Sequence, residues 1–60
     1  MNAQLPNDSV MLLSYVNTQL RDFYHSLDEF CSAFAIDEAE LKGKLDAIDY
    51  HYDKETNQFK

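Results

Sequence analysis

The sequence has one cysteine, one glycine and one proline among its 60 residues, and it has no tryptophan. The single cysteine, Cys31, excludes an intramolecular disulfide and therefore a disulfide-stapled secreted domain. No apolar run approaches the roughly 20 residues of a membrane span, and no signal peptide is evident at the start. These absences predict a cytoplasmic protein with no membrane association.

Basic residues are also scarce. Eleven acidic residues outnumber five basic ones, which gives a formal net charge of −6. Such a charge repels polyanions and anionic membrane surfaces at long range. Nucleic acid is thus an unlikely partner, and a solvated surface or a basic protein partner is favoured.

The sequence contains no signature of catalysis or metal binding. There is no glycine-rich phosphate loop and no nucleophile paired with a base at a recognisable spacing. The metal-ligand candidates His25, Cys31 and His51 lack the paired spacing that is typical of zinc sites. We therefore predict a protein that is not an enzyme, with no catalytic residues, no metal and no cofactor.

The composition is that of one globular domain over residues 1–60. Hydrophobic residues make up 45% of the chain and aromatic residues 13%, which is too rich for a disordered segment. A chain this short buries only about 60% of its unfolded surface. Most large apolar side chains must therefore serve the core, and little room is left for an enclosed active site.

Three helices are predicted after a loose N-terminal arm over residues 1–7. An apolar arc with a spacing of about 100° per residue predicts an amphipathic helix over 9–24, with Asp8 or Ser9 as its cap. Ser26 and Glu29 form a capping box before a helix over 27–34. A similar start at Asp37 precedes a helix over 38–48.

The last segment, 50–60, changes to a period of two and predicts a β-hairpin. Strands are expected over about 50–53 and 57–60, with Asn57 in a left-handed conformation at the turn. The fold class is mainly α: three short helices and a C-terminal two-stranded hairpin, in winged helix-turn-helix-like order. The expected core consists of Leu13, Val16, Leu20, Phe23, Leu27, Phe30, Phe34, Ile36, Leu41, Leu45, Ile48, Tyr50, Tyr52 and Phe59.

Residues 27–48 follow the spacing of a helix-turn-helix motif, in which Ala35 stands where glycine is expected. If the motif bound DNA, its recognition helix would present outward positions whose charges are unsuited to phosphate. The hypothesis of a nucleic-acid-binding winged helix is therefore kept only as the alternative. Its recognition positions are Glu38, Ala39, Lys42, Gly43 and Asp46.

The favoured hypothesis is a non-catalytic protein-interaction module that binds an unknown partner or a second copy of itself. Met11 and Tyr15 lie one turn apart on the otherwise polar side of the first helix, and both residue types are common at interfaces. Two simpler alternatives exist: isolated exposed apolar residues are normal, or a slightly rotated helix or the N-terminal arm covers both side chains. Asn17, at the border of the apolar arc, is either a buried hydrogen-bonding anchor or, as is more common, a partly exposed side chain.

Three stretches also carry a resemblance to known proteins: DSVMLLS at 8–14, LDE at 27–29, and YHYD at 50–53 followed by NQF at 57–59. The chain resembles a family of bacterial proteins of about this length whose function is not characterised. The resemblance covers nearly the whole chain. It implies a small free-standing bacterial domain, and it brings no activity, cofactor or site residues.

The predicted inward face of the third helix can be tested by the substitution Leu41→Ala. Removing a buried leucine side chain should lower the free energy of unfolding by about 2–5 kcal/mol, and the whole domain is expected to have only about 3–9 kcal/mol. Chemical denaturation measures this loss. A midpoint unchanged within error would show that Leu41 does not lie in the core.

Overall fold

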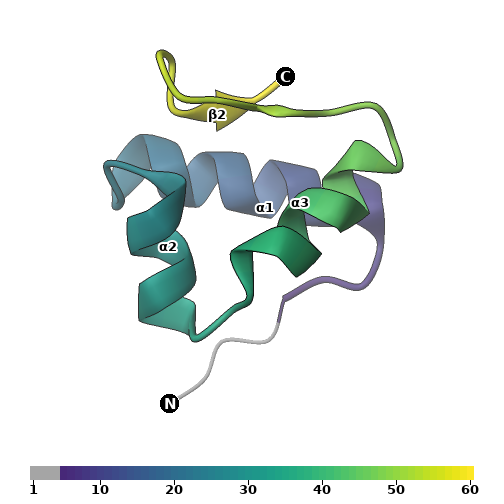
Figure 1. Cartoon of the computed structure of the whole chain (residues 1–60), viewed down its shortest axis with the longest axis horizontal. Helices are drawn as coiled ribbons and strands as arrows, with labels where there is room; N and C mark the ends of the chain where they lie inside the picture. The colour runs from purple at the N-terminus through teal and green to yellow at the C-terminus, as the bar shows by residue number, and fades with distance from the viewer. Residues whose placement is uncertain (1–4) are drawn as a thin grey trace.

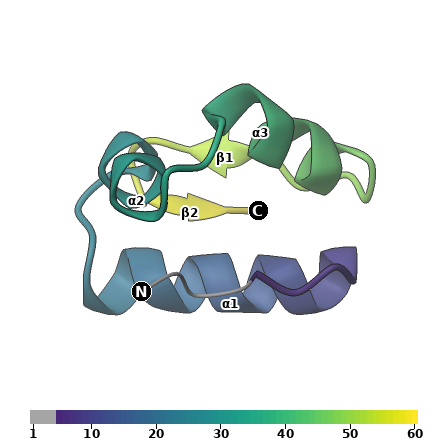
Figure 2. The ribbon, with the colours of Figure 1, turned by 90° about the horizontal axis from the view of Figure 1, so that it is seen from below.

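Three helices followed by a short antiparallel hairpin make up the fold, which a computed structural model describes for residues 5–60 (Figure 1). In Figure 2, α1 forms one layer, and α2, α3 and the hairpin lie over it, with β2 nearer to α1 than β1 is. The predicted fold class is confirmed. The elements are α1 (Ser9–Asp22), α2 (Leu27–Phe34), α3 (Glu38–Asp46), β1 (Tyr52–Asp53) and β2 (Gln58–Phe59).

Each helix begins at the predicted capping residue. Asp8 and Asp37 accept hydrogen bonds from backbone N–H groups two residues later, both at 3.0 Å. Ser26 Oγ accepts from the N–H of Glu29 at 3.1 Å, as a capping box requires. The Glu29 carboxylate accepts a hydrogen bond from the N–H of His25, whereas in a capping box it accepts from the N–H of the cap residue, here Ser26. Local side-chain chemistry therefore fixes all three helix starts.

α2 ends at Phe34 as predicted, whereas α1 and α3 each end two residues earlier than predicted. Phe23, at the end of α1, is the main correction. α1 ends at Asp22, and Phe23 adopts a non-helical φ of −129°. Because of this backbone conformation, the Phe23 ring does not lie on the apolar face of α1. Phe23 is 68% exposed instead of lying in the core. Tyr24 takes the inward place and packs edge-on against Phe30, with ring centroids 5.6 Å apart.

The core draws on every helix and on one strand. Phe59 is 2% exposed and packs with the helix side chains, which places β2 over the core. Several predicted core residues lie at its margin and are only partly buried, among them Leu13, Phe34 and Tyr52. The buried side chains are Leu12, Val16, Leu20, Leu27, Phe30, Cys31, Leu41, Leu45 and Phe59.

Tyr50 was predicted to be a core residue, and it is 39% exposed. The cause is the end of α3. This helix stops at Asp46, and the N–H of Tyr50 donates to the carbonyl of Leu45 at 3.0 Å. Tyr50 thus belongs to the turn after α3, and the regular strand begins only at Tyr52.

Left-handed backbone marks three turns. Asn57 has φ 55°, as predicted, and Asp49 has φ 70°. Ala35, where a helix-turn-helix motif has glycine, also adopts φ 55° and ends α2. The position therefore has the backbone conformation that favours glycine, although its side chain is a methyl group.

The hairpin ladder leaves one pair of residues with backbone groups that point away from the partner strand. His51 and Lys60 exchange both backbone hydrogen bonds, at 3.1 and 2.9 Å. Bonded and non-bonded pairs alternate in antiparallel sheets, so the next pair, Tyr52 and Phe59, directs its N–H and C=O groups outward. On the β2 side these groups meet α1.

Asn17 on α1 satisfies both outward groups of Phe59. Its Nδ2 donates to the Phe59 carbonyl at 3.1 Å, and its Oδ1 accepts from the Phe59 N–H at 2.8 Å. The side-chain amide thus takes the place of a neighbouring strand. Asn17 therefore combines the two alternatives: it is the hydrogen-bonding anchor, and it is only half-buried.

Asn57 fastens the other end of the hairpin. Its Nδ2 donates to the carbonyls of Leu20 and Tyr24 at 3.1 and 3.0 Å. Its Oδ1 accepts from the Tyr52 hydroxyl at 2.7 Å, and that hydroxyl accepts from the N–H of Leu27 at 3.2 Å. One network therefore joins the hairpin turn to the end of α1 and the start of α2.

The substitution Asn17→Ala tests how strongly the hairpin depends on this amide. Alanine is the better helix former, but the substitution leaves the N–H and C=O of buried Phe59 unpaired. We expect a loss of about 2 kcal/mol in the free energy of unfolding, measured by urea denaturation. Thr18→Ala, at the exposed neighbouring position, is the control and should change stability by less than about 0.5 kcal/mol. Equal effects of the two substitutions would contradict the anchor role.

Candidate functional site

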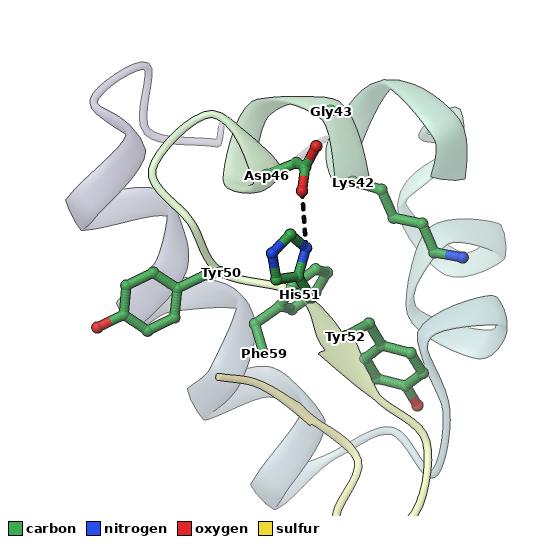
Figure 3. A pocket seen from close by; sticks show the side chains of 7 residues that line it. All are labelled: Lys42, Gly43, Asp46, Tyr50, His51, Tyr52 and Phe59. Carbon is green, nitrogen blue, oxygen red and sulfur yellow. Dashed lines mark ion pairs between the residues drawn. The ribbon is translucent and has the colours of Figure 1, made fainter.

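A hollow on the surface lies between α3 and the hairpin (Figure 3). Its volume is about 350 Å³. The wall on the α3 side includes three of the five positions predicted for a recognition helix, and the opposite wall comes from the start of the hairpin. The lining residues are Lys42, Gly43, Asp46, Tyr50, His51, Tyr52 and Phe59.

The His51 side chain lies close to two carboxylates, those of Asp46 and Asp49. Its Nδ1 lies 2.7 Å from a carboxylate oxygen of Asp46, drawn as the dashed line in Figure 3, and its Nε2 lies 3.6 Å from Asp49. The sequence placed His51 toward solvent, and its side chain is indeed 61% exposed. Exposed ion pairs of this kind contribute little to stability. Both carboxylates therefore remain accessible to a ligand.

The remaining charges near the hollow are paired along the chain. Lys42 Nζ contacts Glu38 at 3.1 Å, one turn earlier on α3. Lys60 Nζ contacts Asp53 at 3.0 Å across the hairpin, and this hydrogen bond lowers the pKa of the Asp53 carboxyl below its ordinary value. Of the charged residues that line the hollow, Lys42 is thus already paired, and Asp46 contacts the exposed His51.

Gly43 has no packing reason to be glycine. A Cβ atom built at this position would meet no heavy atom within 4 Å. Its backbone is ordinary helix, with no positive φ, so neither close approach nor backbone strain calls for glycine. The direct consequence of the missing side chain is an open wall on the hollow.

The structure divides the predicted recognition positions. Lys42, Gly43 and Asp46 line the hollow, whereas Glu38 and Ala39 stand in the first turn of α3, outside it. Lys42 is the only cation among the five positions, and its ammonium group already contacts a carboxylate. Neutralisation of phosphate supplies most non-specific affinity for nucleic acid, and these five positions offer little of it.

Of the two residues in the predicted patch, Met11 is exposed as expected and Tyr15 is not. Met11 is 60% exposed. Tyr15 is partly buried, because Phe34 of α2 packs edge-on against its ring with centroids 6.3 Å apart. The helical wheel of α1 alone placed Tyr15 on the polar side, since it contains no information about the neighbouring helix.

The described residues offer little for metal or nucleophilic chemistry. Within residues 5–60, no three of the His, Cys, Asp and Glu side chains are grouped so that they could hold a metal ion. Cys31 is buried, and burial raises the pKa of its thiol above the ordinary value. A buried, protonated thiol is a poor nucleophile. Every helix described in this range is also too short or too polar to span a bilayer.

The sequence alone does not predict the hollow, although several of the residues that line it carry predictions of another kind. The sequence predicts Tyr50 in the core, His51 in solvent, and Asp46 and Gly43 among the recognition positions. The signal that it does contain is a pair of acids, Asp46 and Asp49, followed two residues later by His51. Their convergence depends on the sharp turn between α3 and β1.

The substitution Gly43→Ala should stabilise the domain, because the added methyl group meets nothing and alanine favours the helix. We expect a gain of about 1 kcal/mol in the free energy of unfolding, and roughly half of that for Gly43→Ser. Urea denaturation of the three proteins measures both differences. A loss of stability for Gly43→Ala would reveal a contact at this position in the folded chain.

Comparison with known proteins places the chain in a family. The family model for a domain of unknown function (DUF4250) matches residues 6–59, which include all five elements, both asparagine anchors and the hollow. No curated protein and no solved structure matches the chain. The predicted resemblance to a family of short proteins of uncharacterised function is confirmed. The chain belongs to the DUF4250 family, a domain of unknown function.

Proposed function

We propose that this domain is a non-catalytic protein-interaction module. The observation that carries the proposal is an apolar strip across α1 and α2, formed by Met11, Tyr15 and Phe34 and called the α1–α2 strip below. Met11 is largely exposed, and the rings of Tyr15 and Phe34 are only partly buried behind it. Met and aromatic side chains are enriched at protein interfaces.

The contact between Tyr15 and Phe34 supports the proposal in a way that a single exposed residue does not. It makes the apolar surface continuous between two helices, and contiguous apolar surface is a better indicator of an interface than scattered residues. The contact between the Tyr15 and Phe34 rings also restricts the orientations of these two side chains before a partner arrives. A preorganised surface loses less conformational entropy when it binds.

The charge of the domain bears on the kind of partner. A net charge of −6 opposes nucleic acid and favours basic proteins. Two copies of the same chain repel each other at long range, but this repulsion is screened beyond about 10 Å at 0.1 M salt. A homodimer through the α1–α2 strip is thus the form of the proposal that is tested most directly.

Met11→Ser tests this interface, with Val10→Ser as the matched control. Val10 is equally exposed, at 64% against 60%, but it lies on the flank of α1 that faces the hairpin. Burying a methionine side chain contributes about 1.5–3 kcal/mol, so Met11→Ser should weaken self-association at least about tenfold. Sedimentation equilibrium of the two variants and the parent protein measures this difference.

A second measurement identifies the interface and the competing class of partner. Amide shifts that change with protein concentration should centre on Met11, Tyr15 and Phe34 and persist at high salt. A strict monomer at high concentration would remove the homodimer. Shifts along α3 on addition of duplex DNA at low salt, lost as salt rises, would overturn the proposal in favour of a nucleic-acid-binding protein.

A further inference from the structure

We infer that the open edge of β1 beside the hollow binds an extended segment of a basic partner protein by strand addition. The inference rests on the proposed interaction function and names the chemistry of the partner. It uses a surface separate from the α1–α2 strip.

The two edges of the hairpin are satisfied differently. On β2, the outward N–H and C=O of Phe59 are both bonded to Asn17. On β1, the matching groups of Tyr52 point to the opposite edge, because Tyr52 and Phe59 form one non-bonded pair. No residue from 5 to 60 bonds to these two Tyr52 groups. An extended backbone presents the donor and acceptor that they require.

Tyr52 also lines the hollow, so its free edge has space beside it. Gly43 borders the same space, and it is the helix residue that packing does not explain. A glycine inside a helix costs about 1 kcal/mol relative to alanine. An occupant that approaches α3 closely supplies a reason for this cost, since any side chain at residue 43 would project into its path.

Charge selects a basic segment. Asp46 is the carboxylate that lines the hollow, and Asp49 lies 3.6 Å from the lining residue His51. The ammonium group of Lys42, which also lines it, is paired with Glu38. The Asp49 side chain is 99% exposed and Asp46 is 61% exposed, so both are available to a cation. A second copy of this chain is less suited to the site because it carries the same net charge of −6.

The probe is a capped peptide of alternating lysine and valine, with a glutamate–valine peptide as its charge-reversed control. In NMR titrations of the full chain, the lysine peptide should shift the amides of Gly43, Asp46, His51 and Tyr52. Hydrogen exchange at the Tyr52 N–H should slow about tenfold when nine-tenths of the protein is bound, because only the free tenth exchanges. Exchange at Phe59, already bonded to Asn17, should not change.

Two variants complete the test. Gly43→Leu adds a side chain over the hollow and should remove the peptide-induced shifts while the domain stays folded. Ala39→Leu adds the same side chain one turn earlier, outside the hollow, and should leave binding intact. Equal binding by both variants, or unchanged Tyr52 exchange with bound peptide, would overturn the inference.

The outcome is independent of the test of the α1–α2 strip. Peptide-induced shifts confined to Met11, Tyr15 and Phe34 would support the interaction function and overturn the site at β1. An absence of any shift with the lysine peptide would also overturn the site at β1, and the sedimentation of Met11→Ser would still decide the wider proposal.

Discussion

The paired hydrogen bonds between the Asn17 side chain and the backbone of Phe59 hold the fold together. A hairpin whose strands have two residues each has only marginal stability by itself. This hairpin adds the buried Phe59 ring to a core that the helices alone would leave uncovered. Asn17 makes the placement specific, because its amide offers one donor and one acceptor with the spacing of a backbone unit. Asn57 then fixes the turn to the carbonyls of Leu20 and Tyr24.

This arrangement gives the hairpin two unlike edges. The edge against α1 is closed by a side chain of the same molecule, whereas the edge against α3 borders a hollow with carboxylates and a glycine around it. Exposed strand edges are usually kept short or charged to prevent unwanted pairing. Here the edge is short, and Asp46 is among the residues beside it. In the proposed strand addition, both features favour brief, basic, extended segments.

Most of the fold could be predicted because its determinants are local. Asp8, Ser26 and Asp37 start the three helices through bonds within a few residues. The predictions are wrong where a helix end or a neighbouring element decides the outcome. Phe23 lies outside the core because α1 ends at Asp22, and Tyr15 is partly buried because Phe34 packs against it. Neither outcome can be predicted from the periodicity of a single helix.

The sequence by itself determined three helices, a terminal hairpin, the left-handed turn at Asn57 and an acidic surface, since caps, period and charge are properties of short stretches of chain. Only the tertiary structure decided what Asn17 bonds to, which edge of the hairpin stays open, and that Gly43 faces a hollow. These depend on residues 42 positions apart, such as Asn17 and Phe59, meeting in space. The helix packing that brings them together fixes distances and directions that no spacing along the chain contains.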